Sequence, residues 1–163
     1  MTEWIRFNYK QDTSLFGILI GDYVDEYEGN LFETPKPTGR RIPINEVQLQ
    51  APLEPHSIYA LWNNFHERAE KEEQTIPDVP LYFMKPLTSV IGPEQTIYRP
   101  RGHQGRVIFE AELGIVIGSK CREVGESEAA EYIFGYTCVN DVTAVEFLFE
   151  DKAFQQWTRC KGF

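Results

Sequence analysis

The chain has 163 residues, 25% of them charged and 42% hydrophobic, so it can bury the core of a modest soluble domain. Its formal net charge of -9 argues against a general nucleic-acid or membrane-surface binder, since both need a basic surface. Three widely spaced cysteines exclude a disulfide framework and zinc-finger spacing; with no signal peptide or long apolar stretch, we expect a cytoplasmic protein.

The leading segment is expected to form a small β-rich domain, residues 1–50. Its short β-type runs are punctuated by glycine, aspartate and asparagine, for example at Gly21 and Gly29, which is typical of turns between meandering strands. The segment TPKPTGRR, residues 34–41, is rich in proline and glycine and predicts a loop or linker. Residues 51–163 are then expected to form a second domain.

The second domain alternates helical and strand patterns. SIYALWNNFHERAEKEEQ, residues 57–74, carries a helical stretch with a charged end, and VPLYFMKP, residues 79–86, predicts a short strand closed by a proline. VIFEAELGIVIG, residues 107–118, predicts a further strand. EYIFGYTCVNDVTAVEFLFEDKAFQQW, residues 131–157, predicts a β-like run to about Asn140 and then a helix beginning near Asp141, with capping-box spacing between Thr143 and Glu146.

Two carboxylates interrupt the apolar strand at residues 107–118. Because side chains alternate along a strand, Glu110 and Glu112 point to the same side, with their Cα atoms ~7 Å apart. A divalent cation would relieve their repulsion, and oxygen-only ligands favour Mg²⁺, Mn²⁺ or Ca²⁺. Asp141 can supply a third carboxylate. The alternatives are a solvent-exposed strand face for the pair and a plain helix N-cap for Asp141.

Four motifs in order, LYFMKP, FEAELGIVIG, YIFGYTCVNDVTA and WTRCKGF, resemble the catalytic domain of the fumarylacetoacetate hydrolase superfamily. The resemblance is strong from about Tyr59 to Phe163. It implies an α+β, mainly β fold, a mixed β-roll preceded by a small β-rich domain. It also implies a homodimer and a Mg²⁺, Mn²⁺ or Ca²⁺ ion held by Glu110, Glu112 and Asp141.

The same resemblance assigns further site residues. His66 matches a histidine that serves as general base, and Glu70 would orient it, although relatives commonly place that acid at the position of Ala69. Lys85 would bind a substrate carboxylate, and Lys161 would stabilise an enolate or oxyanion as charge develops. The alternatives are a surface histidine, a lysine that extends from a strand edge, and a charge near a chain end.

These assignments predict an enzyme that acts on a small 2-oxo acid, an acylpyruvate or a dicarboxylate, through a metal-bound enolate and hydrolyses a carbon–carbon bond. An alternative is an isomerase or decarboxylase of unsaturated oxo-dicarboxylates in aromatic degradation of the homoprotocatechuate type. A further alternative is an inactive, metal-stabilised binding module. Because WTRCKGF stops where further strands are expected, we also expect the sequence to be a fragment of a longer protein.

Overall fold

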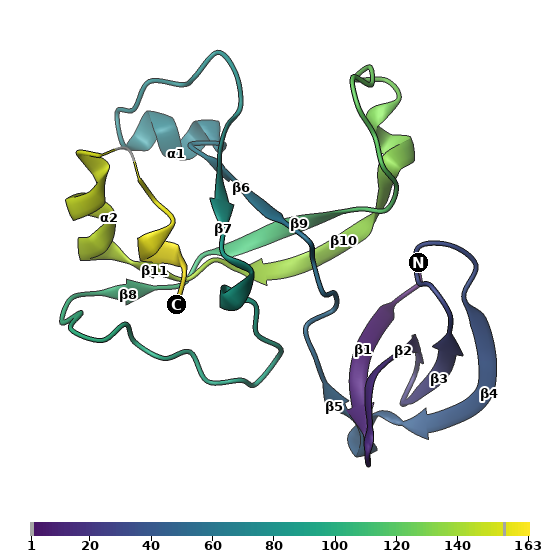
Figure 1. Cartoon of the computed structure of the whole chain (residues 1–163). Coiled ribbons are helices and arrows are strands. Elements are labelled where there is room, and N and C mark those ends of the chain that lie inside the picture. Colours follow the sequence, from purple (N-terminus) through teal and green to yellow (C-terminus); the bar gives the residue numbers. More distant parts are fainter. Residues whose placement is uncertain (1, 155) are drawn as a thin grey trace. The chain divides into compact units, whose positions relative to one another are not determined.

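A computed structural model describes residues 2–154 and 156–163, which form two compact units. The first unit comprises the residues up to Glu54 together with Ile91–Gln95 and Ala111–Asn140. The second comprises Pro55–Val90, Thr96–Glu110 and Asp141–Phe163. More of the described residues lie in strands than in helices, and the prediction of a mainly β fold is confirmed (Figure 1).

The leading part of the first unit is an antiparallel sheet of five strands. These are β1 (Trp4–Tyr9), β2 (Asp12–Ile20), β3 (Tyr23–Glu28), β4 (Lys36–Pro43) and, after the short helix η1 (Ile44–Glu46), β5 (Gln48–Leu49). Their order is β4-β3-β2-β1-β5, so the first four strands meander as predicted. The turn between β2 and β3 contains Gly21 at φ +59°, a left-handed conformation that glycine adopts without strain.

The prediction of a loop or linker at residues 34–41 is wrong, because most of this segment lies in β4. β4 pairs only with β3 and forms an edge of the sheet, where a proline removes no ladder hydrogen bond. Gly39 of β4 has φ +84°, and the pairing register between β3 and β4 shifts between Asp25 and Tyr27. This irregularity in the pairing allows proline and glycine to lie within the strand. Proline and glycine are thus compatible with a strand at the edge of a sheet.

Three strands supply the core of this sheet. Phe7, Val24 and Ile42 come from β1, β3 and β4 and are at most 2% exposed. Burying each of these side chains contributes on the order of 2 kcal/mol.

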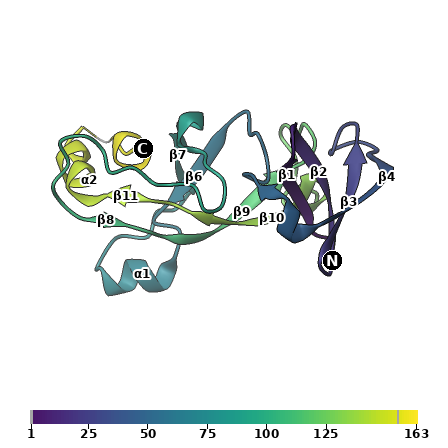
Figure 2. The ribbon, with the colours of Figure 1, turned by 90° about the horizontal axis from the view of Figure 1, so that it is seen from below.

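The first unit also contains a long hairpin of β9 (Ala111–Ile117) and β10 (Ile133–Asn140), joined through the short helix η3 (Ala129–Tyr132). The two strands run side by side in Figure 1 and in the view from below in Figure 2. The predicted alternation is present: Glu112 is half-buried, whereas Leu113 and Ile115 are 68% and 56% exposed. The side of β9 that carries the carboxylate is therefore the more protected side.

The strand predicted at residues 107–118 is divided in two. β8 (Val107–Ile108) pairs with β11 (Thr143–Ala144), whereas β9 pairs with β10. Phe109 and Glu110 lie between β8 and β9, and the Asp141 N–H donates to the Glu110 carbonyl at 2.9 Å. The backbone thus stays paired across the interruption.

The second unit holds two short strand pairs and the two α-helices of the described chain. Besides β8 and β11, its elements are β6 (Ile58–Trp62), α1 (His66–Lys71), β7 (Leu81–Lys85), η2 (Leu87–Ser89), α2 (Val145–Lys152) and η4 (Arg159–Lys161). β6 and β7 form an antiparallel pair, and β7 lies where a strand was predicted. The helix predicted within residues 57–74 is limited to α1, and β6 precedes it. Neither helix is long and apolar enough to cross a membrane.

The helix expected near Asp141 begins four residues later than predicted. α2 starts at Val145, its N-cap is Ala144, and no side chain caps it. Thr143, expected to act in a capping box, lies in β11 and donates its hydroxyl hydrogen to Glu110 at 2.5 Å. The capping-box prediction is wrong because that hydroxyl has a carboxylate partner from a distant part of the chain.

Candidate metal centre

Three predicted ligands converge in the structure. Glu110 precedes β9, Glu112 lies two residues further on in β9, and Asp141 directly follows β10. Each offers one carboxylate oxygen, and these oxygens lie within 4.8 Å of one another. Three hard oxygen donors at this separation fit one Mg²⁺, Mn²⁺ or Ca²⁺ ion, with coordination positions left for water or substrate.

Asp141 is the most buried member of the group. It is 2% exposed, whereas Glu110 and Glu112 are half-buried. A buried carboxylate is costly unless it is paired and hydrogen-bonded. The burial of Asp141 therefore requires cations nearby, and the second unit provides them.

Two lysines bind the Asp141 carboxylate, one at each oxygen. The Lys85 ammonium donates to Oδ1 and, at 3.1 Å, to the carbonyl oxygen of Lys161. The Lys161 ammonium donates to Asp141 Oδ2 at 2.6 Å and to Glu110 Oε1 at 2.9 Å. Lys85 comes from the end of β7 and Lys161 from η4, so two distant segments meet at one carboxylate.

The pairing changes the acidity of Lys161. Burial alone would lower its pKa, but the hydrogen bonds and charges of Asp141 and Glu110 together outweigh burial, so the pKa lies above its ordinary value of 10.5. Lys161 thus carries a proton and a positive charge at neutral pH. Its ammonium group and that of Lys85 offset the negative charges of Asp141 and Glu110 in this largely buried place.

Glu110 is held by partners on both of its oxygens. Oε1 accepts from Thr143 and Lys161, and Oε2 lies 3.8 Å from NH1 of Arg68 on α1. Thr143 is 1% exposed, so its hydroxyl fixes this carboxylate from a buried position. Sequence reasoning missed both Thr143 and Arg68 as neighbours of the carboxylates, because neither lies near Glu110 in the chain.

His66 and Glu70 are placed differently from the carboxylates. Both are exposed on α1. Each is two residues from Arg68, and two helical residues correspond to a turn of about 200°. Since Arg68 faces Glu110, His66 and Glu70 point to roughly the opposite side of the helix. Their predicted roles as base and orienting acid stay predictions.

A buried histidine that sequence reasoning did not single out lies beside α2. His103 is 2% exposed; its Nε2 lies 3.0 Å from Glu146 Oε2 and its Nδ1 lies 3.3 Å from NH1 of Arg99. Gly105 approaches Glu146 so closely that a Cβ there would meet the carboxylate. The backbone N–H of Arg106 lowers the pKa of Glu146, with His103 contributing less. The loop before β8 is thereby attached to the first turn of α2.

Comparison with known proteins identifies the family. The model of the fumarylacetoacetate (FAA) hydrolase C-terminal family matches residues 57–163, which is more than half of the chain. The chain belongs to the fumarylacetoacetate hydrolase family. A second family model, Rv2993c-like N-terminal, matches residues 3–52.

Relatives and solved structures agree with this membership. An uncharacterized protein of Archaeoglobus fulgidus is 43% identical over 125 residues, which cover 77% of this chain and 48% of the relative. The chain spans about half the length of such curated relatives. The 5-carboxymethyl-2-hydroxymuconate delta-isomerase of Mycobacterium smegmatis has a TM-score of 0.85 and 34% identity, and the match covers all of this chain and 62% of that one.

A more distant structure shares the fold. It is the maleylpyruvate hydrolase of a Sphingobium species, solved in complex with manganese(II) and pyruvate, with a TM-score of 0.65 and 22% identity. The match covers 88% of this chain and 59% of that one. The fold of this family therefore extends to a hydrolase that binds a divalent ion and a 2-oxo acid.

Proposed function

We propose that the protein is a divalent-metal-dependent enzyme that hydrolyses a carbon–carbon bond in a small 2-oxo acid, an acylpyruvate or a dicarboxylate. The carboxylate oxygens within 4.8 Å of one another are the observation that carries this proposal. Glu110, Glu112 and Asp141 would hold Mg²⁺, Mn²⁺ or Ca²⁺. When bound, the ion supplies Lewis acidity that polarises the keto group of the substrate.

The lysines of the site suit the charge changes of such a reaction. Lys161 and Lys85 place ammonium groups beside Asp141, where they can bind the substrate carboxylate and stabilise negative charge on its keto oxygen. We assign to His66, oriented by Glu70, the removal of a proton from the water that attacks the far carbonyl carbon; this role requires α1 to turn toward the carboxylates the side that lies opposite Arg68. The carbon–carbon bond breaks, its electron pair stays with the oxo-acid fragment, and that carbon receives the proton.

The second candidate is an isomerase or decarboxylase of unsaturated oxo-dicarboxylates in aromatic degradation. It is favoured by the 34% identity to the mycobacterial structure, whose name is that of a delta-isomerase. Both reactions need the same polarised keto group and differ in the fate of the neighbouring carbon.

Other parts of the proposal concern organisation and location. We propose a leading domain at residues 1–50 and a catalytic domain at residues 51–163, a homodimer, a small-molecule partner and no nucleic-acid partner. A cytoplasmic location is supported by the free thiols of Cys121, Cys138 and Cys160.

The test compares turnover before and after chelation. The full-length protein is treated with EDTA, reloaded with Mg²⁺ or Mn²⁺, and incubated with acetylpyruvate, oxaloacetate or an unsaturated hydroxy-dicarboxylate, and the products are analysed. Pyruvate and acetate indicate the hydrolase, carbon dioxide the decarboxylase, and an absorbance shift without cleavage the isomerase. His66→Ala should keep metal binding and lose most hydrolysis. Equal activity after chelation contradicts the proposal, and metal binding without any turnover indicates an inactive module.

A further inference from the structure

Arg68 on α1 brings an accessible positive charge to the candidate metal centre. Its side chain is 61% exposed, whereas those of Lys85 and Lys161 are 11% and 10% exposed. Both lysines already donate to Asp141, so a ligand has to compete with that carboxylate for them. We propose that Arg68 is a further substrate-binding residue and that its guanidinium binds the carboxylate of the oxo acid. This inference rests on the proposed function, because the oxo acid is taken to bind at the candidate metal centre.

The guanidinium of Arg68 lies beside Glu110 without a hydrogen bond to it. Nη1 is 3.8 Å from Glu110 Oε2, whereas a nitrogen–oxygen hydrogen bond spans about 2.7–3.2 Å. Glu110 has Thr143 and Lys161 at its other oxygen, Oε1. Arg68 is therefore close to a predicted metal ligand, and it can turn the N–H groups of Nη1 toward an anion that lies next to that ligand.

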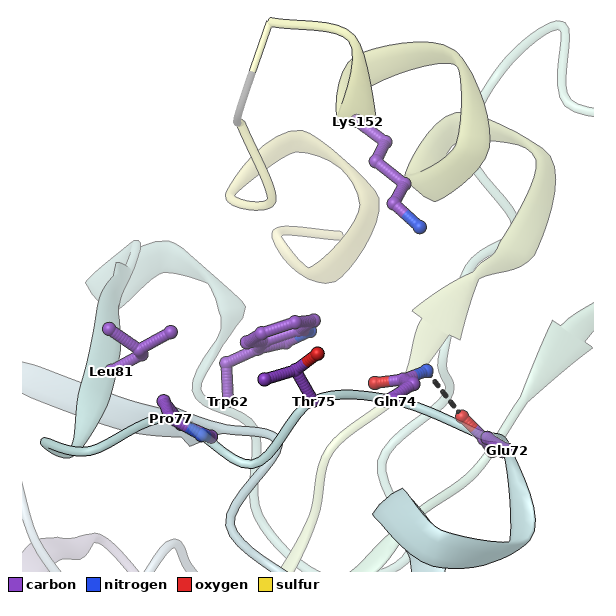
Figure 3. A pocket seen from close by; sticks show the side chains of 7 residues that line it. All are labelled: Trp62, Glu72, Gln74, Thr75, Pro77, Leu81 and Lys152. Atoms are coloured by element: carbon purple, nitrogen blue, oxygen red, sulfur yellow. Dashed lines mark hydrogen bonds between the residues drawn. The ribbon is translucent and has the colours of Figure 1, made fainter.

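Glu72 orients this guanidinium from the end of α1. Its Oε1 accepts from Arg68 Nε at 2.9 Å, and its Oε2 accepts from Gln74 Nε2 at 2.7 Å, a bond that Figure 3 draws as a dashed line. The backbone N–H of Gln74 donates to the carbonyl of Ala69, a buried residue, at 2.8 Å. The segment after α1 thus holds the carboxylate that orients Arg68. Because Nε donates to Glu72, the two Nη groups form the side of the guanidinium that a ligand can reach.

The charge and shape of a guanidinium select a carboxylate. Its parallel N–H groups match the two oxygens of a carboxylate, and it stays charged at every physiological pH. With a divalent ion bound, the positive charges of the ion, of Arg68 and of the two lysines exceed the negative charges of the three carboxylates, so the centre attracts an anion. In a 2-oxo acid the carboxylate is bonded directly to the keto carbon. One molecule can therefore reach both the ion and Arg68.

The experiment measures ligand binding rather than turnover. Oxalate, a stable dicarboxylate that resembles an enolised 2-oxo acid, is titrated calorimetrically into full-length, Mn²⁺-loaded protein. We expect Arg68→Met to bind oxalate at least tenfold more weakly than the unsubstituted protein. Arg68→Lys should recover only part of the affinity, because an ammonium lacks the paired N–H groups, and Glu72→Gln should show a smaller loss. Arg122→Met, at an exposed arginine of the first unit, is the matched control and should leave the affinity unchanged. An unchanged affinity in Arg68→Met overturns the proposal.

The affinity for Mn²⁺ separates substrate binding from a structural role of Arg68. A positive charge 3.8 Å from a predicted ligand opposes a bound cation, so Arg68→Met should bind Mn²⁺ at least as tightly as the unsubstituted protein. Equal losses of Mn²⁺ and oxalate affinity would mean that Arg68 only orients Glu110, and they would overturn the proposal. A loss of oxalate affinity in His66→Ala with none in Arg68→Met would also overturn it, because the opposite side of α1 would then face the ligand.

Comparison with turnover separates failure of this inference from failure of the proposed function. If no oxo acid is turned over but oxalate affinity depends on Arg68, the residue is assigned correctly and the proposed enzymatic function is wrong. If turnover depends on the metal and oxalate affinity does not depend on Arg68, the reverse holds. If the protein binds no divalent ion, both are wrong.

Discussion

Lys161 Nζ lies 2.6 Å from Asp141 Oδ2, so the most buried carboxylate of the candidate metal centre carries an ion pair of its own. Lys85 binds its other oxygen. A divalent ion would therefore join or displace ammonium groups at a site that is already partly neutralised. Because both lysines are also the proposed substrate contacts, metal binding and substrate binding should affect each other.

Asp141→Asn should weaken metal binding and also destabilise the metal-free protein. The substitution leaves two largely buried ammonium groups without their shared carboxylate, and removing one partner of such a pair costs on the order of 3 kcal/mol. Chemical denaturation in EDTA measures this loss, and calorimetric titration with Mn²⁺ measures the affinity.

Two further variants test the cause. The double change Asp141→Asn with Lys85→Met should recover part of the stability, because Asp141 is the carboxylate that Lys85 pairs with, whereas Lys161 keeps its pair with Glu110. Glu123→Gln breaks an exposed pair with Arg122 and should change stability by less than about 1 kcal/mol. Equal stability losses for Asp141→Asn and Glu123→Gln would show that the lysine contacts contribute nothing.

Thr143→Val should lower stability by about 2 kcal/mol, the range for a buried hydrogen bond to a charged group. The valine methyl replaces the hydroxyl that donates to Glu110 at 2.5 Å, so this carboxylate loses a buried neutral donor. Mn²⁺ affinity should fall as well, because Glu110 is less well oriented. Thr143→Ser keeps the hydroxyl and should retain both properties to a large extent; equal behaviour of the two variants would contradict this role.

The sequence predicts the strands and the carboxylates well because both follow from local patterns. Alternation places Glu112 on the protected side of β9, and the acid at the end of β10 is recognisable as Asp141. The part of the site that could not be predicted depends on contacts between distant segments. Arg68 is 42 residues from Glu110, and nothing in its own neighbourhood indicates that partner.

The sequence predicts an element less well where its local composition and its long-range contacts favour different structures. Proline and glycine at residues 34–41 indicate a loop by composition, and only the position of β4 at a sheet edge makes them acceptable in a strand. Thr143 and Glu146 have capping-box spacing, yet each makes its contact elsewhere, with Glu110 and His103. A local motif fails where a long-range partner binds the same side chain more strongly.

Cys160 should resist alkylation at a pH at which Cys121 and Cys138 react. Cys160 is buried and its thiol donates to the Trp157 carbonyl, whereas the other two cysteines are exposed. Burial raises its pKa above the ordinary value of 9.0, although the charge of Lys161 acts in the opposite direction. Because the folded state holds this proton more tightly, its contribution to stability is complete below pH 9 and decreases as pH rises above it.

Mass spectrometry after iodoacetamide at pH 8 counts the modified thiols, and we expect two in the folded protein and three in urea. Unfolding measured between pH 8 and 10 should show a smaller decrease in stability for Cys160→Ser than for the unsubstituted protein. Rapid labelling of all three cysteines in the folded state would contradict the buried position.

His103→Ala should destabilise the second unit by about 2–3 kcal/mol, because it leaves a cavity and removes a buried donor. Arg99 can only donate, so His103 Nδ1 accepts from it and Nε2 donates its hydrogen to Glu146.

The same substitution should raise the pKa of Glu146 toward its ordinary value of 4.5, although the Arg106 N–H keeps part of the shift. Since a lowered pKa stabilises the fold above pH 4.5 and this stabilisation is lost as pH falls, the variant should lose less stability on acidification. Denaturation at pH 7 and at pH 4 measures both effects. His56→Gln, at an exposed position of the same unit, is the control. A stability at pH 7 equal to that of the control would mean that the loop before β8 is attached to α2 by other contacts.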